Sequence, residues 1–513
     1  MSAWNVGLAL PEWILTATAL VALFYDARSP ADDKKESIKW VWFGLLAATA
    51  CVVIEWMGMK TGEKAWAFRG HFGFDAFSAL LKTLFGLTAM MVLSIADHWL
   101  KRVDRGHAEF HLLTIFATLG MFFVCSVEDF AGLFVALELI TISFFCLTAF
   151  KRNDERAIEA GIKYVVLGAI ASSFLLFGIA FLYGATGSLR LDALGGVAEA
   201  FAHGGEDAPL LNFGLLLVII GLGFKIAAVP FQVWTPDVYE GAATPVTAFL
   251  SMGSKAAGVT LLMKVARACL GDGAAGLATA APWIIFIVVI AAATILYGSL
   301  GAMFQTNIKR LLGYSSIGHA GYILMGFAAF DQAGFAAIVY YLMAYLFTVI
   351  AVFAVVVIVN GVIRSHRIED YSGLARRSPL LGFVLTCGLL SLAGVPPFAG
   401  FFGKFLVFRA LIAKAGALGD MGPDYAAASV STYTLAFIGA AGVVISLYYY
   451  LMVVKRIYMD APPEGSEEQP IVAPQRLKGL LYACLAGIFL LGMVMGPFMA
   501  LAESAAAALV AVH

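Results

Sequence analysis

The sequence predicts an all-α protein that crosses a membrane many times. Hydrophobic residues make up 61% of the 513 residues and charged residues only 13%, whereas about a quarter of residues are charged in soluble domains. Apolar runs of roughly 20 residues, the length of helix that spans a hydrocarbon core of about 30 Å, recur along the whole chain. Two runs are broken by proline and several contain a charged side chain, which indicates a hydrated interior.

Counting the apolar runs gives fourteen expected transmembrane helices. The N-terminus has no basic segment and no small-residue cleavage pattern, so the first run is expected to be a retained helix rather than a signal peptide. The longest interruptions, at 185–209 and in the Pro- and Glu-rich segment 458–475, have the composition of loops. The runs lie at approximately 7–25, 38–57, 74–97, 107–126, 130–150, 157–184, 210–240, 245–270, 281–303, 310–328, 333–362, 379–413, 431–457 and 476–508.

The seventh and twelfth runs are expected to be discontinuous helices. Each contains a Val-Pro step, in "AAVPFQVW" at 227–234 and in "AGVPPFAGFFGKF" at 393–405. Proline removes a backbone donor and its ring clashes with the preceding turn, so a helix breaks there. Irregular backbone at membrane depth is tolerated only inside protein or beside water. The two breaks therefore predict a hydrated pathway through the protein and not a lipid-facing surface.

Helices 4–8 and helices 9–13 form two sets of five in which the fourth member is broken. Because five is an odd number, the second set is expected to lie upside down relative to the first, as in the inverted repeats of many transporters. This divides the chain into helices 1–3 at 1–106, a first repeat at 107–270, a second repeat at 281–457 and a C-terminal helix at 476–513.

Alternate connections between the helices are rich in Lys and Arg, which predicts the orientation. The even-numbered connections hold little beyond Lys60, Lys64, Arg69, Arg190 and Arg267. Since the basic connections face the cytoplasm, both termini are expected on the opposite side. The odd-numbered connections hold Arg28, Lys34, Lys35, Lys101, Arg102, Arg105, Lys151, Arg152, Arg156, Lys309, Arg310, Arg364, Arg367, Arg376, Arg377, Lys455, Arg456, Arg476 and Lys478.

Composition excludes several classes of function. The formal net charge is −1 and no basic domain or arm is present, so nucleic acid is not an expected partner. The cysteines stand singly in apolar stretches, without the spacing that binds a metal, an iron–sulfur cluster or a haem. We therefore expect no cofactor in this chain. The cysteines are Cys51, Cys125, Cys146, Cys269, Cys387 and Cys484.

Charged side chains stand inside four apolar runs. Glu138 lies in the fifth run and Lys225 in the seventh, just before its break. Lys255 lies in the eighth run, and Lys404 follows the break of the twelfth. An ionisable group at the bilayer centre costs at least about 2.5–3.5 kcal/mol on insertion scales, so four of them require a shared functional reason.

Three further residues have two interpretations each. Lysines near helix ends can extend their charged ends to the interface, and this alternative stays open for Lys163 and Lys264. His319, on a tenth run rich in small residues, is either a packing residue or a member of a relay.

A glutamate and several lysines can together move protons. Lysine has a reference pKa of about 10.4. Desolvation lowers the pKa of a lysine, and a carboxylate drawn close raises it again. A lysine whose distance to Glu138 changes is therefore a proton acceptor in one state and a donor in the other. Water in the broken helices would connect such groups, and no redox cofactor is needed for this step.

Several segments together resemble one family closely: subunit N of the proton-pumping NADH:quinone oxidoreductase, respiratory complex I, an antiporter-like subunit related to the Mrp antiporters. The resemblance covers nearly the whole chain. The segments that carry it are "GLFVALELITIS" at 132–143, "AIEAGIKYVVLGAIASS" at 157–173, "KIAAVPFQVWTPDVYEGAATPVTAFL" at 225–250, "NIKRLLGYSSIGHAGY" at 307–322 and "AGVPPFAGFFGKF" at 393–405.

The resemblance implies roles for individual residues. Glu138 and Lys225 match the modulating pair, and Lys163 matches the family's lysine on the sixth helix. Lys255 matches a relay lysine, and Lys404 matches the lysine that delivers protons toward the outer side. His319 matches a family histidine between these last two. Each five-helix repeat is then a proton half-channel.

One position departs from the family pattern. Many members read F-H-x-W after the break of the seventh helix, whereas this chain reads "FQVW" with Gln232. A histidine at this position is therefore not required for proton transfer here.

The resemblance also implies partners and a location. NADH, FMN, iron–sulfur clusters and quinone are expected in partner subunits, and the neighbours are the M-type subunit and the small K-, J- and A-type membrane subunits. The implied location is the bacterial inner membrane, with both termini on the periplasmic side. The M-type subunit has a glutamate where this chain has Lys404, and the L-type subunit continues into a lateral arm.

Two other functions compete with a pumping subunit. An Mrp-type Na⁺/H⁺ antiporter subunit would share every physical argument given above, and the motifs that match subunit N favour the oxidoreductase. A purely structural scaffold explains the helices but not the buried charges.

Overall fold

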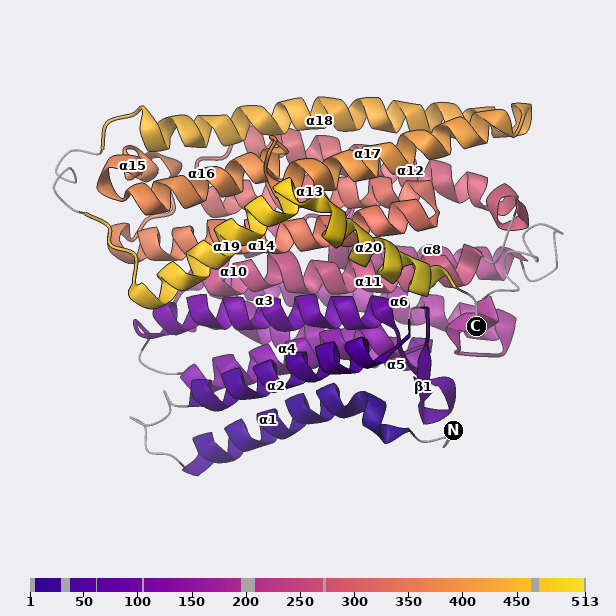
Figure 1. Cartoon of the computed structure of the whole chain (residues 1–513), viewed down its shortest axis with the longest axis horizontal. Coiled ribbons are helices and arrows are strands. Elements are labelled where there is room, and N and C mark those ends of the chain that lie inside the picture. The colour runs from indigo at the N-terminus through magenta and orange to yellow at the C-terminus, as the bar shows by residue number, and fades with distance from the viewer. Residues whose placement is uncertain are drawn as a thin grey trace.

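The computed structural model describes residues 5–28, 37–60, 62–103, 106–194, 208–270, 274–462 and 470–511. The described chain is a stack of roughly parallel helices whose ends form two opposite faces (Figure 1). Twelve helices in the described residues are long and apolar enough to cross a membrane, and Pro379–Ala393 and Met495–Val510 are shorter apolar helices. The chain is an all-α polytopic membrane protein, as its composition predicts.

The first six long helices follow the predicted runs, and α3, α5 and α6 begin at an aspartate cap. Asp75 and Asp129 each accept a hydrogen bond from a backbone N–H in the first turn of the helix that follows them. Such caps satisfy donors that the first turn leaves free. The helices are α1 (Leu10–Arg28), α2 (Ser37–Gly58), α3 (Ala76–Leu100), α4 (His107–Ser126), α5 (Phe130–Thr148) and α6 (Glu155–Thr186).

A short β-hairpin between α2 and α3 was not predicted by the sequence. Strand β1 (Ala65–Ala67) pairs antiparallel with β2 (Phe72–Phe74), with Trp66 opposite Gly73. Strands of three residues are too short to give a period-2 pattern, so the hydropathy profile could not reveal them.

The seventh and eighth runs fold into several shorter helices. α8 (Ala208–Ile226) ends directly after Lys225, and α9 (Trp234–Gly241) resumes after the Val-Pro step. α10 (Thr244–Phe249) continues through one π-helical turn (Leu250–Ser254) into α11 (Lys255–Leu270). π-turns are rare and occur frequently at functional sites, and this one ends at Lys255. α12 (Ala274–Met303) follows.

The remaining helices are α13 (Ile308–Ala329), α14 (Gln332–Ile363), α15 (Leu374–Arg377), α16 (Pro379–Ala393), α17 (Ala399–Asp420), α18 (Ala426–Tyr458), α19 (Gln475–Met493) and α20 (Met495–Val510). α16 and α17 are the two parts of the interrupted twelfth run.

The expectation of one continuous C-terminal helix at 476–508 is wrong. The chain leaves the helical conformation at Val494, with φ −120° and ψ 58°, and so divides this run into α19 and α20. Pro497 accounts for the break, since its ring clashes with the carbonyl of the residue four positions earlier. Gly492 permits a close approach here, because a Cβ atom on it would lie 1.9 Å from the carbonyl oxygen of Pro397.

α14 and α11 occupy the centre of the stack. In α14, 94% of the most apolar 18-residue window is buried, whereas in α6 and α18 the share is 33%. α14 packs against α16, α17, α19 and α20, and α11 packs against α8 and α4. The interior between these helices is where side chains from both halves of the chain meet.

Candidate functional site

Four of the predicted residues lie in this interior. Lys225, Lys255, His319 and Lys404 come from α8, α11, α13 and α17, and they are 2%, 5%, 6% and 4% exposed. Glu138 on α5 is half-buried. Charged groups this deeply buried in a membrane protein require polar partners.

Glu138 and Lys225 lie at the α5 side of this interior. Ser172 on α6 donates its hydroxyl to Oε1 of Glu138 at 2.5 Å. Lys225 donates to the hydroxyl of Thr141, which follows Glu138 by three residues and shares its face of α5. Glu138 is also the acidic group whose charge acts on Lys225. The ammonium thus bonds a residue one helical turn from Glu138, and it forms no ion pair with the carboxylate within the described part of the chain.

The break after Lys225 leaves polar backbone and side chains inside the protein. Ala227 adopts a left-handed conformation with φ 62°, and Trp234 Nε1 donates to the carbonyl of Phe224 at 3.0 Å. Oε1 of Gln232 and Oγ1 of Thr235 are buried without a hydrogen-bond partner among the described residues. Both oxygens can accept from water, so the break has the chemistry of a hydrated site.

Lys255 is held by hydroxyl and carbonyl groups. Its Nζ donates to the carbonyl and to Oγ of Ser316 on α13, at 2.9 and 2.5 Å. The hydroxyls of Tyr239 and Tyr345 lie 3.0 and 3.1 Å from the same Oγ. Of the described carboxylates, none forms an ion pair with Lys255. Its proton can therefore be exchanged without breaking an ion pair.

His319 connects the two halves of the site. Its Nδ1 lies 2.5 Å from the hydroxyl of Tyr341, and its Nε2 lies 3.3 Å from that of Tyr450. In a neutral imidazole one nitrogen donates and the other accepts. The charges of Lys255 and Lys404 both act on this ring. His319 can therefore receive a proton on one nitrogen and release one from the other.

Lys404 is stabilised by the end of α16. Its Nζ donates to the carbonyl of Ala393 at 2.9 Å and lies 4.7 Å from the centre of the Tyr322 ring. The C-terminal carbonyls of a helix attract a cation, so the break supplies negative potential without a carboxylate. Gly394, with φ 87°, turns the chain here, and a Cβ on it would meet the Lys404 side chain at 3.0 Å.

Small cavities lie on both sides of His319. One of about 10 Å³ is lined by Lys255, Ser316 and His319, and a second of the same size by His319, Tyr341 and Gly403. Each is close to the smallest space that holds one water molecule. Side-chain hydroxyls and single waters can thus link Lys255 to the neighbourhood of Lys404.

The structure places Lys163 apart from the line of buried polar groups that contains Lys225, Lys255, His319 and Lys404. Its side chain is 41% exposed and pairs with Glu159 at 2.8 Å and with Asp237 at 2.7 Å. Asp237 also binds Arg310 at 2.8 Å, which joins α6, α9 and α13 at one end of the stack. Lys163 thus reaches the surface, as expected of a lysine that extends its charged end to the interface. Lys264, in contrast, stays buried and contacts Glu128 at 3.2 Å.

Sequence reasoning missed the tyrosines and serines of the line, and it missed one buried ion pair. Hydroxyl groups carry no hydropathy signal in a membrane helix, so Ser316 and Tyr450 could not be singled out. The buried pair is Lys82 of α3 with Glu12 of α1, whose Nζ and Oε1 lie 2.6 Å apart. Lys82 did have a signal, because it stands inside the apolar run at 74–97.

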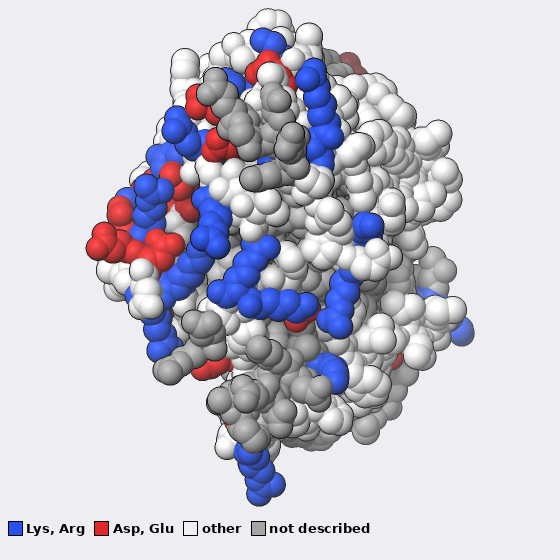
Figure 2. Space-filling view, turned by 90° about the vertical axis from the view of Figure 1, so that its left-hand side faces the viewer, with Lys and Arg blue, Asp and Glu red and all other residues white. Residues whose placement is uncertain are grey.

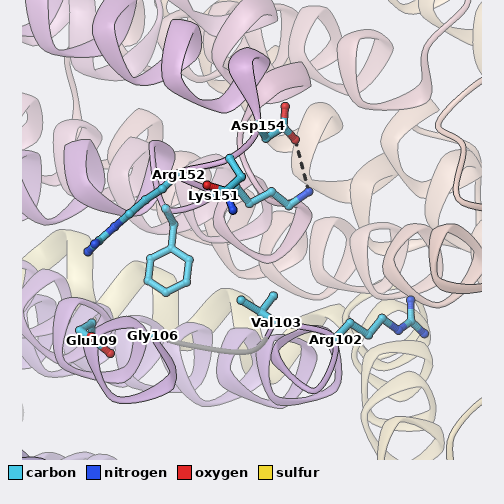
Figure 3. Close-up of a pocket in the computed structure, with 9 residues that line it drawn as sticks. Arg102, Val103, Gly106, Glu109, Lys151, Arg152 and Asp154 are labelled. Atoms are coloured by element: carbon cyan, nitrogen blue, oxygen red, sulfur yellow. Dashed lines mark ion pairs between the residues drawn. The ribbon is translucent and has the colours of Figure 1, made fainter.

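A larger pocket lies away from the line, at one end of the stack (Figure 3). It has a volume of about 820 Å³ and is lined by basic and acidic side chains, including Arg102, Lys151 and Arg152. Lys151 and Asp154, which follow α5 in the chain, form an ion pair of 3.6 Å on one side of it (Figure 3). Its position between the ends of α3 and α5 makes it part of the charged surface of the molecule.

Known proteins share this sequence and fold. The family profile described as "NADH:quinone oxidoreductase/Mrp antiporter, TM" matches residues 127–419. The NADH-quinone oxidoreductase subunit N of Rhodospirillum rubrum is 37% identical over 98% of this chain and 97% of its own length.

Two solved structures extend the comparison to the fold. A chain of respiratory complex I from Thermus thermophilus with bound Aureothin is 30% identical, with TM-score 0.76, over 96% of this chain and 98% of its own. A chain of the Mrp complex from Dietzia is 22% identical, with TM-score 0.81 over 99% and 98%, and shares the fold. By its identity over nearly its whole length, the chain belongs to the family of NADH-quinone oxidoreductase subunit N.

Proposed function

We propose that the chain is a membrane-arm subunit of an NADH:quinone oxidoreductase and translocates protons, driven by quinone reduction in partner subunits. The observation that carries this proposal is the line of buried titratable groups and hydroxyls described above. It runs from Glu138 through Lys225, Lys255 and His319 to Lys404. Buried ionisable groups inside a membrane protein mark ion and proton pathways.

Proton transfer depends on the distance between Glu138 and Lys225. When the carboxylate approaches, Lys225 holds its proton more tightly, and when the carboxylate withdraws, the buried ammonium releases it. Thr141 keeps Lys225 near Glu138 but outside direct contact, so a small movement of α5 or α8 changes their interaction. The released proton passes through water at the helix break to Lys255.

The second part of the pathway begins at Lys255. Ser316 accepts from Lys255, and His319 lies one turn further along α13. A proton that reaches His319 leaves from its other nitrogen toward Tyr341 and Lys404. Lys404 then passes it to the outer side. Lys163, with Glu159 and Asp237, collects protons at the charged end of α6.

We assign fourteen crossings to the chain, with each interrupted pair of helices counted as one. Segments 107–270 and 281–457 are then inverted repeats that each contribute a proton half-channel, flanked by helices 1–3 at 1–106 and a last segment at 476–513. The assignment is supported by α1 beginning and α20 ending at the same end of the stack (Figure 1).

The opposite end faces the cytoplasm in this assignment. Figure 2 views that end and has Lys and Arg side chains spread across it. Basic residues are retained on the cytoplasmic side, so the termini lie on the periplasmic side of a bacterial inner membrane. Lys34, Lys35 and Arg105 lie outside the described residues.

Redox chemistry belongs to partner subunits. NADH, FMN, iron–sulfur clusters and quinone would bind there, and this chain would contact the M-type and small K-, J- and A-type membrane subunits. Among the described residues, no group of three or more His, Cys, Asp or Glu side chains could hold a metal ion.

The proposal is tested by removing the pair that controls proton affinity. Glu138→Ala and Lys225→Ala, each in the complete complex, should lower the initial rate of proton uptake into inverted vesicles roughly tenfold or more, as lost acid–base groups do. Lys101→Ala, which removes a lysine whose side chain is 54% exposed, is the control and should pump normally. Native gels show whether each variant is assembled into the complete complex. If both variants assemble and pump like the parent, the pair does not control proton transfer.

A further inference from the structure

A cavity large enough for several water molecules lies at the end of the stack where α12 and α18 end and α13 begins. Its volume is about 220 Å³, which is room for several water molecules at roughly 30 Å³ each. Phe304 and Tyr448 line it and are 80% and 53% exposed, so they form its outer rim. Glu369 also lines it, and its side chain is 56% exposed. The cavity therefore opens to the surface beside an exposed carboxylate.

The inner wall of the cavity is formed by Tyr449, which is 4% exposed. The ring of Tyr449 lies 4.4 Å from that of Tyr450, measured between centres. Tyr450, in turn, is fully buried and bonds Ser315 and Nε2 of His319, the latter at 3.3 Å. Two adjacent tyrosines thus lie between the cavity and the buried imidazole.

We propose that this cavity is a separate proton entrance, which supplies His319 through Tyr449 and Tyr450 without passing Lys225 or Lys255. The inference rests on the proposed function, because it takes His319 to be a member of the pathway. It adds a second source of protons, in the half of the chain that contains Lys404.

The transfer is balanced at every oxygen. A hydronium ion in the cavity gives a proton to the hydroxyl of Tyr449 and leaves a water molecule. The proton of Tyr449 moves to Tyr450, either directly or through the hydroxyl of Ser315, which passes its own proton on. The O–H bond of Tyr450 then breaks as a new N–H bond forms at Nε2 of His319. The proton on Nδ1 moves to the hydroxyl of Tyr341, which releases its own proton toward Lys404, so each hydroxyl ends with the proton count with which it began.

The placement of the two tyrosines distinguishes them from the rest of their helix. α18 lies at the edge of the stack, and only 33% of its most apolar window is buried. Tyr449 and Tyr450 are adjacent and both buried, although neighbouring residues on a helix point about 100° apart. Tyr449 lines the cavity, and the hydroxyl of Tyr450 meets Ser315 and His319 on α13. If the two tyrosines served only in packing, their aromatic rings would be sufficient. A proton entrance also needs their hydroxyl groups.

The test therefore removes a hydroxyl and keeps the ring. Tyr450→Phe in the complete complex should lower the rate of proton uptake into inverted vesicles roughly tenfold, because the last donor to His319 is lost. Tyr458→Phe is the matched control, since Tyr458 lies on the same helix, is 43% exposed and does not line the cavity. It should pump like the parent.

A second measurement blocks the cavity while both tyrosine hydroxyls stay in place. Met452 lines the cavity and is 40% exposed, so Met452→Cys should react with a membrane-impermeant maleimide added to inverted vesicles. Labelling should slow proton uptake, whereas labelling of Tyr458→Cys should not. This measurement decides the question if Tyr450→Phe does not assemble.

The outcomes separate the entrance from the proposed function. If Tyr450→Phe and labelled Met452→Cys both pump like the parent while Lys225→Ala is impaired, the entrance is wrong and the proposed function stands. If Lys225→Ala also pumps like the parent, the proposed function itself is contradicted.

Discussion

The buried ion pair between α1 and α3 allows a quantitative prediction about stability. Nζ of Lys82 lies 2.6 Å from Oε1 of Glu12, and the two side chains are 0% and 2% exposed. The ammonium also lies 4.9 and 5.2 Å from the ring centres of Phe72 and Phe74 in the β-hairpin. Lys82→Met removes the cation and leaves the carboxylate of Glu12 buried without an opposite charge.

The expected loss follows from this geometry. Removing one member of a buried pair costs about 3–5 kcal/mol, because the remaining charge has neither water nor a partner. Replacing both members should be far less costly, since the desolvation of both charges is then avoided. The double variant Glu12→Gln with Lys82→Met should therefore recover most of the lost stability.

The assay is reversible unfolding of the purified chain in mixed detergent micelles, with the other five cysteines replaced by alanine. Cys125 is a free thiol on α4, 2% exposed, and α4 packs against both α1 and α3, so its reaction with a fluorescent thiol reagent reports unfolding there. A loss below about 1 kcal/mol for Lys82→Met, the value of an exposed pair, would refute the reasoning. So would a double variant that is no more stable than the single one.

Three further predictions concern the pathway, the orientation and the cofactors. Lys404→Arg should lower pumping and quinone reduction together, because a guanidinium does not release its proton, whereas Lys414→Arg on the same helix should leave both unchanged. Full pumping by the Lys404→Arg complex would mean that a fixed charge is sufficient. A cysteine introduced in loop 365–378 should react with an impermeant reagent only from the cytoplasmic side; reaction from outside would reverse the topology. The purified chain should show no stoichiometric flavin, haem or iron–sulfur absorbance, and such a signal would contradict the assignment of redox chemistry to partners.

The sequence alone was sufficient to predict the class of protein, most helix positions and several of the charged residues that stand inside apolar runs. Hydropathy is a local property, so runs of apolar residues predict helices without knowledge of their neighbours. Proline acts on its own turn of helix, which is why the interruptions after Lys225 and before Lys404 could be located. A charge in an apolar run is costly in any fold, so Glu138 and Lys255 were identified before any contact was known.

Only the tertiary structure decided which groups these charges touch. Ser316 is 61 positions from Lys255, and Tyr450 is 131 positions from His319. Such partners depend on which helices pack together, and a hydroxyl in an apolar helix gives no local signal of its partner. The same reason explains why the motif of Lys163 did not reveal its partner Asp237, which is 74 positions away. The sequence shows where a charged side chain must be buried at a cost in free energy. The packing of the helices determines which polar groups offset that cost.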